Sequence, residues 1–457
     1  MKKYITYIGL ATYLALIVLS LIFWLERTAF LDISFHLFHI LKDKYFAIQN
    51  YRFGAFITQI PILLCDSLNC SLKAIMRCYS LGFVLYYLII FVVILFFLKS
   101  YEFALLLLFL NTLMVGDTFY WIQSELQQGL ALLILYFSFV YSIQYKIRVP
   151  KFIIYPVLGA LLFTIAFMHP LLLFPFLYFS IFLYIDNDRI RPYILGGGLY
   201  YFIMVAIKFA FFNTAYESTS LSGLKNLYVL FPNYIYLESN AQFLKNIPGK
   251  YHFLIILLIT TLVLYINRHH YLKALIVISF FIGYIMLINI SYPKGADEFY
   301  IENMYLPLIL FVTAPIVLDF YPLLNTKPRI TALMLAVLVS ISLYRIYNTH
   351  KIYTARIELL QRFLNRTGGT PKMIISERHF PMDTLMMSWA TPYEIWLLST
   401  ISSDSTRCVM ITDNVKSMHH AKNLRWHFVT RWGIYEYSAL PKKYFKFRDT
   451  LPYMIVE

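Results

Sequence analysis

Residues 4–32 read YITYIGLATYLALIVLSLIFWLERTAFLD, an apolar run that passes into charged residues and reaches the first aspartate of the chain at Asp32. The part from Tyr4 to Leu25 is long enough to cross the ~30 Å hydrocarbon core of a bilayer as a helix. Two lysines precede it, as in a signal peptide, but it exceeds the usual apolar core of one, and residues 24–27 lack the small side chains of a cleavage site. We therefore expect a retained first membrane span.

Apolar blocks of this kind recur along the chain until about residue 347. The 457 residues are 60% hydrophobic and only 14% charged, which is not the composition of a soluble globular protein. Much of the net charge of +15 comes from Lys and Arg in short loops between apolar blocks, as the positive-inside rule describes. We therefore expect the lipid bilayer as a partner, and no nucleic acid.

The apolar blocks predict an all-α, polytopic transmembrane domain over residues 1–347. We place eleven spans near 4–25, 79–98, 102–116, 126–143, 152–168, 170–185, 193–212, 252–267, 274–290, 303–319 and 330–347. If the amino terminus is cytoplasmic, each short inner loop is basic. The basic residues of these loops are Lys99, Lys146, Arg148, Lys151, Arg189, Arg191, Arg268, Lys273, Lys327 and Arg329.

Two long outer loops are expected, at residues 26–78 and 213–251. The first contains the apolar segment 53–65, whose thirteen residues are too few to cross a bilayer comfortably. A full span there would reverse the side of every later loop and break the charge pattern. We therefore expect an interfacial or re-entrant segment, which leaves Arg52, Lys73 and Arg77 outside, against the charge rule.

Residues 348–457 differ in character from the rest and predict a soluble outer-side domain. Strand-like runs at 373–376, 408–412 and 453–456 alternate with mixed segments rich in turn residues. A segment of ~110 residues is long enough to fold by itself. We therefore expect a small C-terminal α/β domain.

The first outer loop carries a stripe of ionisable side chains. Asp32, His36, His39 and Asp43 are spaced four, three and four residues apart, so a helix over residues 32–49 would place them on one side. One interpretation is an amphipathic helix that lies on the membrane with its polar face in water. The alternative is that Asp32 is a catalytic carboxylate and that His36 and His39 bind phosphate or a metal. A His-x-x-His spacing alone indicates a metal only weakly.

Two later outer turns also carry polar groups. Asp117 and Glu125 enclose an aromatic segment in a turn without Lys or Arg, and Gln128 follows. The rings fit an interfacial belt or, alternatively, the faces of a sugar whose hydroxyls bond to Glu125 and Gln128. His169 and the proline after it divide the apolar run 152–184. This pair is either a turn device or, since the histidine has no charged neighbour in sequence, a functional group with a partner in space.

Lys208 and Arg345 lie near the predicted outer ends of their spans. Each side chain taken alone fits a cation that reaches out to the interface. Together they can hold a lipid phosphate, Arg345 through a forked contact and Lys208 as a point charge. Because two cations at similar depth are tolerated best when they share an anion, we predict one groove for both.

The whole layout resembles that of the GT-C superfamily, the polytopic glycosyltransferases that use polyprenyl-phosphate-linked sugars. The likeness is architectural and covers about the whole chain: one span, a long outer loop that opens with Phe30-Leu31-Asp32, many further spans and a soluble outer domain. In that family a carboxylate of the first outer loop acts as the base or orienting group for the acceptor. Asp32 stands in that place, although the acidic doublet usual in the family is absent.

The resemblance implies transfer of a sugar from a polyprenyl-phosphate donor to a glycan, lipid or protein acceptor, on the outer side of the bacterial inner (plasma) membrane. It implies no cofactor, and a divalent metal stays open. No Gly-x-Gly-x-x-Gly or P-loop motif indicates a nucleotide site. The alternatives are an O-antigen or capsule polysaccharide polymerase, which would use lipid-pyrophosphate oligosaccharides, a transporter, or a receptor. Against a transporter, two related halves with paired interrupted helices are lacking.

Overall fold

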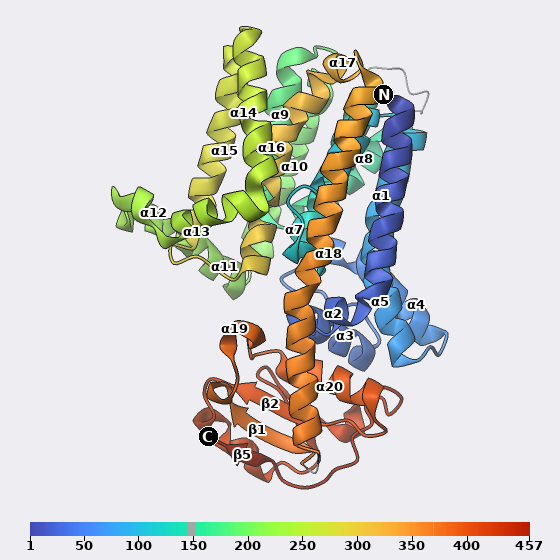
Figure 1. The fold of residues 1–457 in the computed structure, drawn as a ribbon, viewed down its shortest axis with the longest axis vertical. Coiled ribbons are helices and arrows are strands. Elements are labelled where there is room, and N and C mark those ends of the chain that lie inside the picture. The colour runs from blue at the N-terminus through green and yellow to red at the C-terminus, as the bar shows by residue number, and fades with distance from the viewer. Residues whose placement is uncertain (144–150, 369) are drawn as a thin grey trace.

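The structure, a computed structural model, describes residues 1–143, 151–368 and 370–457, most of which are helical (Figure 1). Lys146 and Arg148 of the predicted inner loops fall outside these ranges. Within the ranges, eight helices are long and apolar enough to cross a membrane. They are α1 (Lys2–Ile22), α5 with its π-helical continuation η2 (Leu72–Phe97), α7 (Glu125–Ile143), α10 (Arg191–Phe211), α13 to α14 (Glu238–Asn267), α15 (Tyr271–Ser291), α16 (Glu298–Leu318) and α18 (Pro328–Arg366). Such a set is that of a multi-pass integral membrane protein, as the sequence predicts.

The other three expected spans correspond to shorter apolar helices. These are α6 (Tyr101–Leu110), α8 (Lys151–Ala166) and α9 (Leu173–Asp186), the last preceded by the turn η4 (Pro170–Leu172). In α6, residues 103–110 are all buried, so this helix meets protein and need not match the thickness of a bilayer. The segment 53–65 forms two short pieces, η1 (Phe53–Gln59) and α4 (Ile60–Ser67), and no full span.

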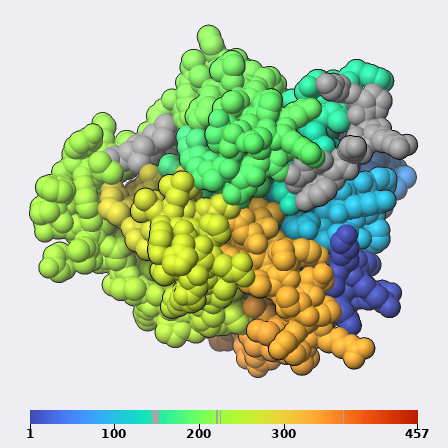
Figure 2. Space-filling view, turned by 90° about the horizontal axis from the view of Figure 1, so that it is seen from above, coloured from blue at the N-terminus to red at the C-terminus, as the bar shows by residue number. Residues whose placement is uncertain are grey.

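The links between α14 and α15 and between α16 and α18 lie at the end of the bundle where the amino terminus lies (Figure 1). The Met1 amino group donates to Asn325 Oδ1 at 3.1 Å, next to the short helix α17 (Tyr321–Leu324). Lys273 forms ion pairs with Asp186 and Asp319 and so joins three further helix ends. Figure 2 shows this end, where segments from blue to orange meet. These links therefore lie at the same end of the bundle as the amino terminus, as the loop charges predict.

The segment 213–251 leads into the bundle through short helices and lies beside it (Figure 1). Its elements are α11 (Ala215–Ser222), η5 (Gly223–Lys225), α12 (Asn226–Val229), η6 (Asn233–Tyr236), α13 (Glu238–Asn246) and η7 (Ile247–Tyr251), followed by α14 (His252–Asn267).

Helix α3 (Leu31–Asp43) follows the short helix α2 (Trp24–Thr28) and lies between the bundle and the C-terminal region (Figure 1). His36 is only 2% exposed, and Leu37 on the next position is fully buried. Phe38 packs against Trp396 of the C-terminal region, with 5.5 Å between ring centroids. The interpretation as a membrane-surface helix with its polar face in water is therefore wrong, because the C-terminal region covers α3. The helix also ends at Asp43, earlier than predicted.

The C-terminal region contains the three predicted strands. They are β1 (Lys372–Ser376), β2 (Cys408–Thr412) and β5 (Met454–Val456), which form a parallel sheet in the order β2-β1-β5. A separate antiparallel pair joins β3 (His427–Val429) to β4 (Ile434–Glu436). Helix α20 (Thr391–Ser402) packs on β2, and the short elements are η8 (Glu377–His379), α19 (Met382–Leu385), η9 (Lys416–Asn423) and η10 (Tyr437–Ala439). Helix α18 connects this region to the bundle and runs without a break through residue 347, where the sequence suggested a boundary.

Candidate functional site

A cavity of about 580 Å³, here called the central cavity, lies between the bundle and the C-terminal region. Four of the residues predicted for the site line it, namely Asp32, His36, Glu125 and His169. They come from α3, from the start of α7 and from the turn before α9. The structure thus brings together groups that are up to 137 positions apart in the chain (169 − 32).

A second cavity of about 320 Å³, here called the apolar cavity, adjoins the first. Most of its wall is aliphatic or aromatic, from α9, α10 and α15, with Arg52, Lys208 and Glu217 as charged members. The residues that line both cavities mark the junction; they are Arg52, His169, Tyr216, Tyr300 and Met304. Helix α10 keeps most of its surface outside the protein, which places the apolar cavity close to the lipid-facing side of the bundle.

Contacts from the bundle and from the C-terminal region fix the position of Asp32. The indole Nε1 of Trp121 donates to Asp32 Oδ2 at 3.1 Å. The backbone N–H of Leu31 donates to Glu394 Oε1 of the C-terminal region at 2.8 Å, and Leu31 itself has a positive φ of 37°. Burial raises the pKa of the Asp32 carboxyl to about 6, helped by the charge of Glu125 and opposed by the Trp121 hydrogen bond. Such a carboxylate can take up a proton near neutral pH.

Four charged side chains form a chain across the junction. Arg52 lies 3.0 Å from Glu125 Oε2 and 3.5 Å from Glu217 Oε1, and Lys208 Nζ lies 3.3 Å from the same Glu217 oxygen. Lys208 and Glu217 are only 1% and 2% exposed, and the Lys208 nitrogen and both Glu217 carboxylate oxygens lack a well-formed hydrogen bond. Burial alone lowers the pKa of Arg52, but Glu125 and Glu217 raise it above its usual value. The cluster therefore contains buried ionisable groups whose hydrogen bonds are incomplete, as expected of a site that receives a ligand.

Sequence reasoning did not assign Arg52 and Glu217 to the site. Arg52 did carry a signal, since it is a basic residue on the side of the membrane where the charge pattern expects none. Glu217 carried no such signal. Its partners Arg52 and Lys208 lie in different elements, 165 and nine positions earlier in the chain (217 − 52 and 217 − 208).

The histidines of the site are neutral. His36 Nδ1 lies 3.1 Å from the carbonyl of Ala47, and burial lowers the pKa of His36 to about 4. Burial also lowers the pKa of His169 well below its usual value, and its Nδ1 accepts from the N–H of Leu171 at 3.2 Å. His39 does not line the cavity and lies 3.5 Å from Asp43. Among the described residues no group of three or more His, Cys, Asp or Glu side chains is placed to hold a metal.

Asp117 and Gln128 lie elsewhere, inside the bundle. Asp117, 1% exposed, forms an ion pair with Lys250 at 2.7 Å and accepts from the Tyr353 hydroxyl at 3.2 Å. Gln128 is fully buried and accepts from the Thr58 hydroxyl at 3.3 Å. Neither Asp117 nor Gln128 lines the central cavity or the apolar cavity.

Arg345 and Lys208 do not share a groove, so this prediction is wrong. Arg345 donates to the carbonyls of Thr112, Leu113 and Lys250, at 3.0, 2.8 and 2.6 Å. It lines a different cavity of about 350 Å³. The physical reason is that α6 ends at Leu110 inside the protein, where the carbonyls beyond the helix end need hydrogen-bond donors, and Arg345 supplies them.

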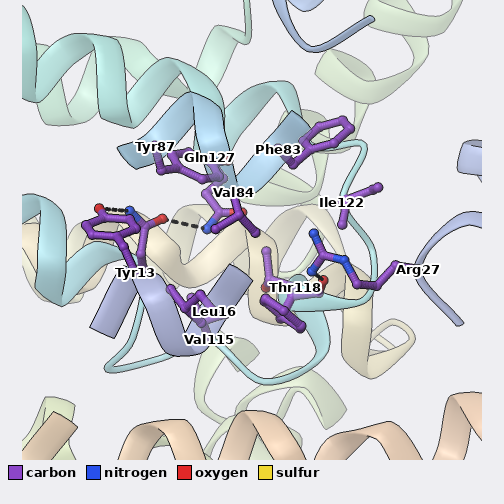
Figure 3. A pocket seen from close by; sticks show the side chains of 12 residues that line it. Tyr13, Leu16, Arg27, Phe83, Val84, Tyr87, Val115, Thr118, Ile122 and Gln127 are labelled. Atoms are coloured by element: carbon purple, nitrogen blue, oxygen red, sulfur yellow. Dashed lines mark hydrogen bonds between the residues drawn. The ribbon is translucent and has the colours of Figure 1, made fainter. Parts of the chain in front are cut away.

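A separate small cavity of about 30 Å³ lies within the bundle (Figure 3). Arg27, 1% exposed, borders it and donates to Ser80 Oγ at 2.8 Å and to the carbonyl of Phe119, with its guanidinium 3.9 Å from the Phe119 ring centre. On its other side, Asn111 donates to the Tyr13 hydroxyl at 3.0 Å. The space holds about one or two water molecules and no substrate. Arg27 therefore fixes the turn that carries Trp121.

Comparison with known proteins identifies no family. No protein-family model matches the chain, and no match is found among curated proteins or solved structures. The resemblance to the GT-C superfamily therefore stays a prediction from the layout of the sequence, and the cavities described above are what a functional proposal has to explain.

Proposed function

We propose that the protein is a membrane glycosyltransferase that moves a sugar from a polyprenyl-phosphate donor to an acceptor on the outer side of the membrane. One observation supports this most: a polar cavity that contains Asp32 adjoins an apolar cavity across a junction of buried charges. A lipid-linked sugar has the same three parts, which are a polar head, a charged phosphate and an apolar chain.

The fit of the donor follows from the order of these parts. The first isoprene units occupy the apolar cavity between α9, α10 and α15, and the rest of the chain stays in lipid. The phosphate lies at the junction, near Arg52 and Lys208. The sugar occupies the central cavity, whose volume of about 580 Å³ is ample for it and within the range of small-molecule sites.

The chemistry uses Asp32 as the base. An acceptor hydroxyl gives its proton to the Asp32 carboxylate while its oxygen forms a bond to the anomeric carbon of the donor sugar. The bond between that carbon and the phosphate oxygen breaks, and the electron pair leaves with the phosphate. Arg52 and Lys208 stabilise the charge that develops there. The Trp121 hydrogen bond and the Glu394 contact to Leu31 keep Asp32 in position.

The charges favour a monophosphate donor over the pyrophosphate of a polysaccharide polymerase. Among the described residues that line the two cavities, Arg52 and Lys208 are the only Lys or Arg. Glu125 and Glu217 already balance them. Each further negative charge brought to the junction has to be accommodated by movement or protonation of one of these carboxylates, and a phosphodiester brings fewer charges than a pyrophosphate.

The test is binding of polyprenyl phosphate to the full-length protein in lipid nanodiscs. Loss of one hydrogen bond to a charged group costs about 1.5–3 kcal/mol. Arg52→Ala and Lys208→Ala should therefore each weaken binding of polyprenyl phosphate roughly 10- to 100-fold. Lys351→Ala is the control, because Lys351 is exposed on α18 away from both cavities. Equal affinities for all four proteins would overturn the proposal.

A further inference from the structure

The C-terminal region supplies one wall of the central cavity, and two of the three described residues in this wall are tryptophans. These residues are Met387, Trp389 and Trp432. Trp432 stands in the turn between β3 and β4, where the N–H of Thr430 donates to the carbonyl of Gly433 at 2.9 Å. Its ring lies 6.3 Å from that of Trp389, at 66°. The β3–β4 turn and the segment before α20 therefore each present one indole ring to the cavity.

Trp432 is 64% exposed although it lines the cavity. An indole left so open to water gives up the stabilisation that burial provides, and large exposed aromatic side chains in a cavity wall mark ligand sites. The polar groups of the cavity, among them Asp32 and Glu125, belong to other parts of the wall. A ligand in this cavity therefore meets aromatic faces from the C-terminal region and hydrogen-bonding groups from the bundle.

This combination matches a sugar ring. A pyranose has C–H groups on its faces, which pack on indole, and hydroxyls at its rim, which need donors and acceptors. The pair also lies close to the reacting carboxylate. The Phe35 ring packs 6.2 Å from that of Trp389, and Phe35 follows Asp32 by three residues, about one helical turn along α3.

We propose that Trp389 and Trp432 form the acceptor subsite and that the acceptor is a carbohydrate. This inference rests on the proposed function and names the acceptor class that the function leaves open. The terminal sugar of the acceptor lies on the tryptophan pair and presents a hydroxyl to Asp32. Neither tryptophan lines the apolar cavity, so the pair is not placed for the apolar chain of a lipid acceptor.

The test is binding of full-length protein in nanodiscs to an array of oligosaccharides that covers the common hexoses, hexosamines and pentoses. We expect binding to at least one group of glycans. Trp432→Ala and Trp389→Ala should weaken it roughly tenfold or more, and Trp432→Phe, which keeps an aromatic face, should weaken it less than about threefold. Trp426→Ala is the matched control, since Trp426 is 61% exposed in the same region but lies outside the cavity.

Three outcomes overturn the inference: no glycan binds, the two alanine variants bind as the wild type does, or Trp426→Ala is as damaging as Trp432→Ala. Polyprenyl phosphate binding measured on the same proteins separates this inference from the proposed function. Glycan binding that depends on the tryptophans, without any binding of polyprenyl phosphate, would count against the donor assignment alone. Binding of polyprenyl phosphate without glycan binding would count against the acceptor assignment alone.

Discussion

Substitution of Glu394 by glutamine should loosen the helix that carries Asp32. Glu394 and Arg356 form an ion pair at 2.7 Å in which both side chains are fully buried. The other oxygen of Glu394 accepts from the N–H of Leu31 at 2.8 Å. Glutamine still offers an acceptor to Leu31, but it leaves the Arg356 cation buried without a counter-charge. Removal of one partner from such a pair costs about 3–5 kcal/mol.

Hydrogen–deuterium exchange of residues 31–43 in nanodiscs measures this loss. A change of that size in the free energy of local opening accelerates exchange by about 100-fold to a few thousand-fold. Arg356→Gln combined with Glu394→Gln removes both charges and should recover most of the protection. The exposed pair Arg431 and Asp413, at 3.7 Å, is the control. Asp413→Asn should cost less than about 1 kcal/mol. The reasoning fails if Glu394→Gln behaves like Asp413→Asn, or if the double variant is worse than the single one.

Three further predictions follow from the site, the packing and the topology. Under the proposed function Asp32 acts as the deprotonated base, and its carboxyl has a pKa of about 6, so the rate of transfer should be flat above that pH and fall about tenfold per unit below it; a rate that rises on acidification would contradict this assignment. In α10, Gly197→Ala should lower the apparent melting temperature, since an added Cβ would lie 2.0 Å from the Tyr136 hydroxyl, whereas Gly198→Ala, with no atom within 4 Å, should leave it unchanged; equal melting temperatures would refute the packing. Single cysteines at positions 99 and 426 should be labelled from opposite sides of the membrane, with position 426 outside, and labelling of position 99 from outside would refute the orientation.

The sequence predicted correctly those elements whose position depends on contact with lipid or water. Lipid requires long apolar helices, so hydropathy located all eight, and the strands β1, β2 and β5 followed from short apolar runs between turns. Helix parity then placed Asp32, Glu125 and His169 at one end of the bundle, which is why they meet in one cavity. Hydropathy counted α6 as a full span because a helix buried in protein is as apolar as one in lipid.

The wrong and missed predictions share a different cause. A residue's neighbours in the sequence do not show which side of the helix bundle it faces. Lys208 and Arg345 have similar predicted depth, but one faces the apolar cavity and the other caps carbonyls beyond α6. Likewise, the burial of α3 depends on a region more than 300 residues later in the chain, of which Glu394 is a part (394 − 31 = 363). Glu217 could not be recognised without its partner Arg52. Such contacts between residues far apart in the sequence can be recognised only in the folded structure.

The central claim is that Asp32 is the base for transfer from a polyprenyl-phosphate sugar. Its most direct test compares Asp32→Asn with the wild type in a transfer assay with a polyprenyl-phosphate hexose in nanodiscs. Asp43→Asn is the matched control, on the same helix but 49% exposed at its far end. Loss of a general base predicts a fall of roughly 10²- to 10⁴-fold for Asp32→Asn, with unchanged folding and with near-normal transfer by Asp43→Asn. Near-normal transfer by Asp32→Asn would contradict the claim and make Glu125, the other carboxylate among the described residues that line the central cavity, the next residue to test.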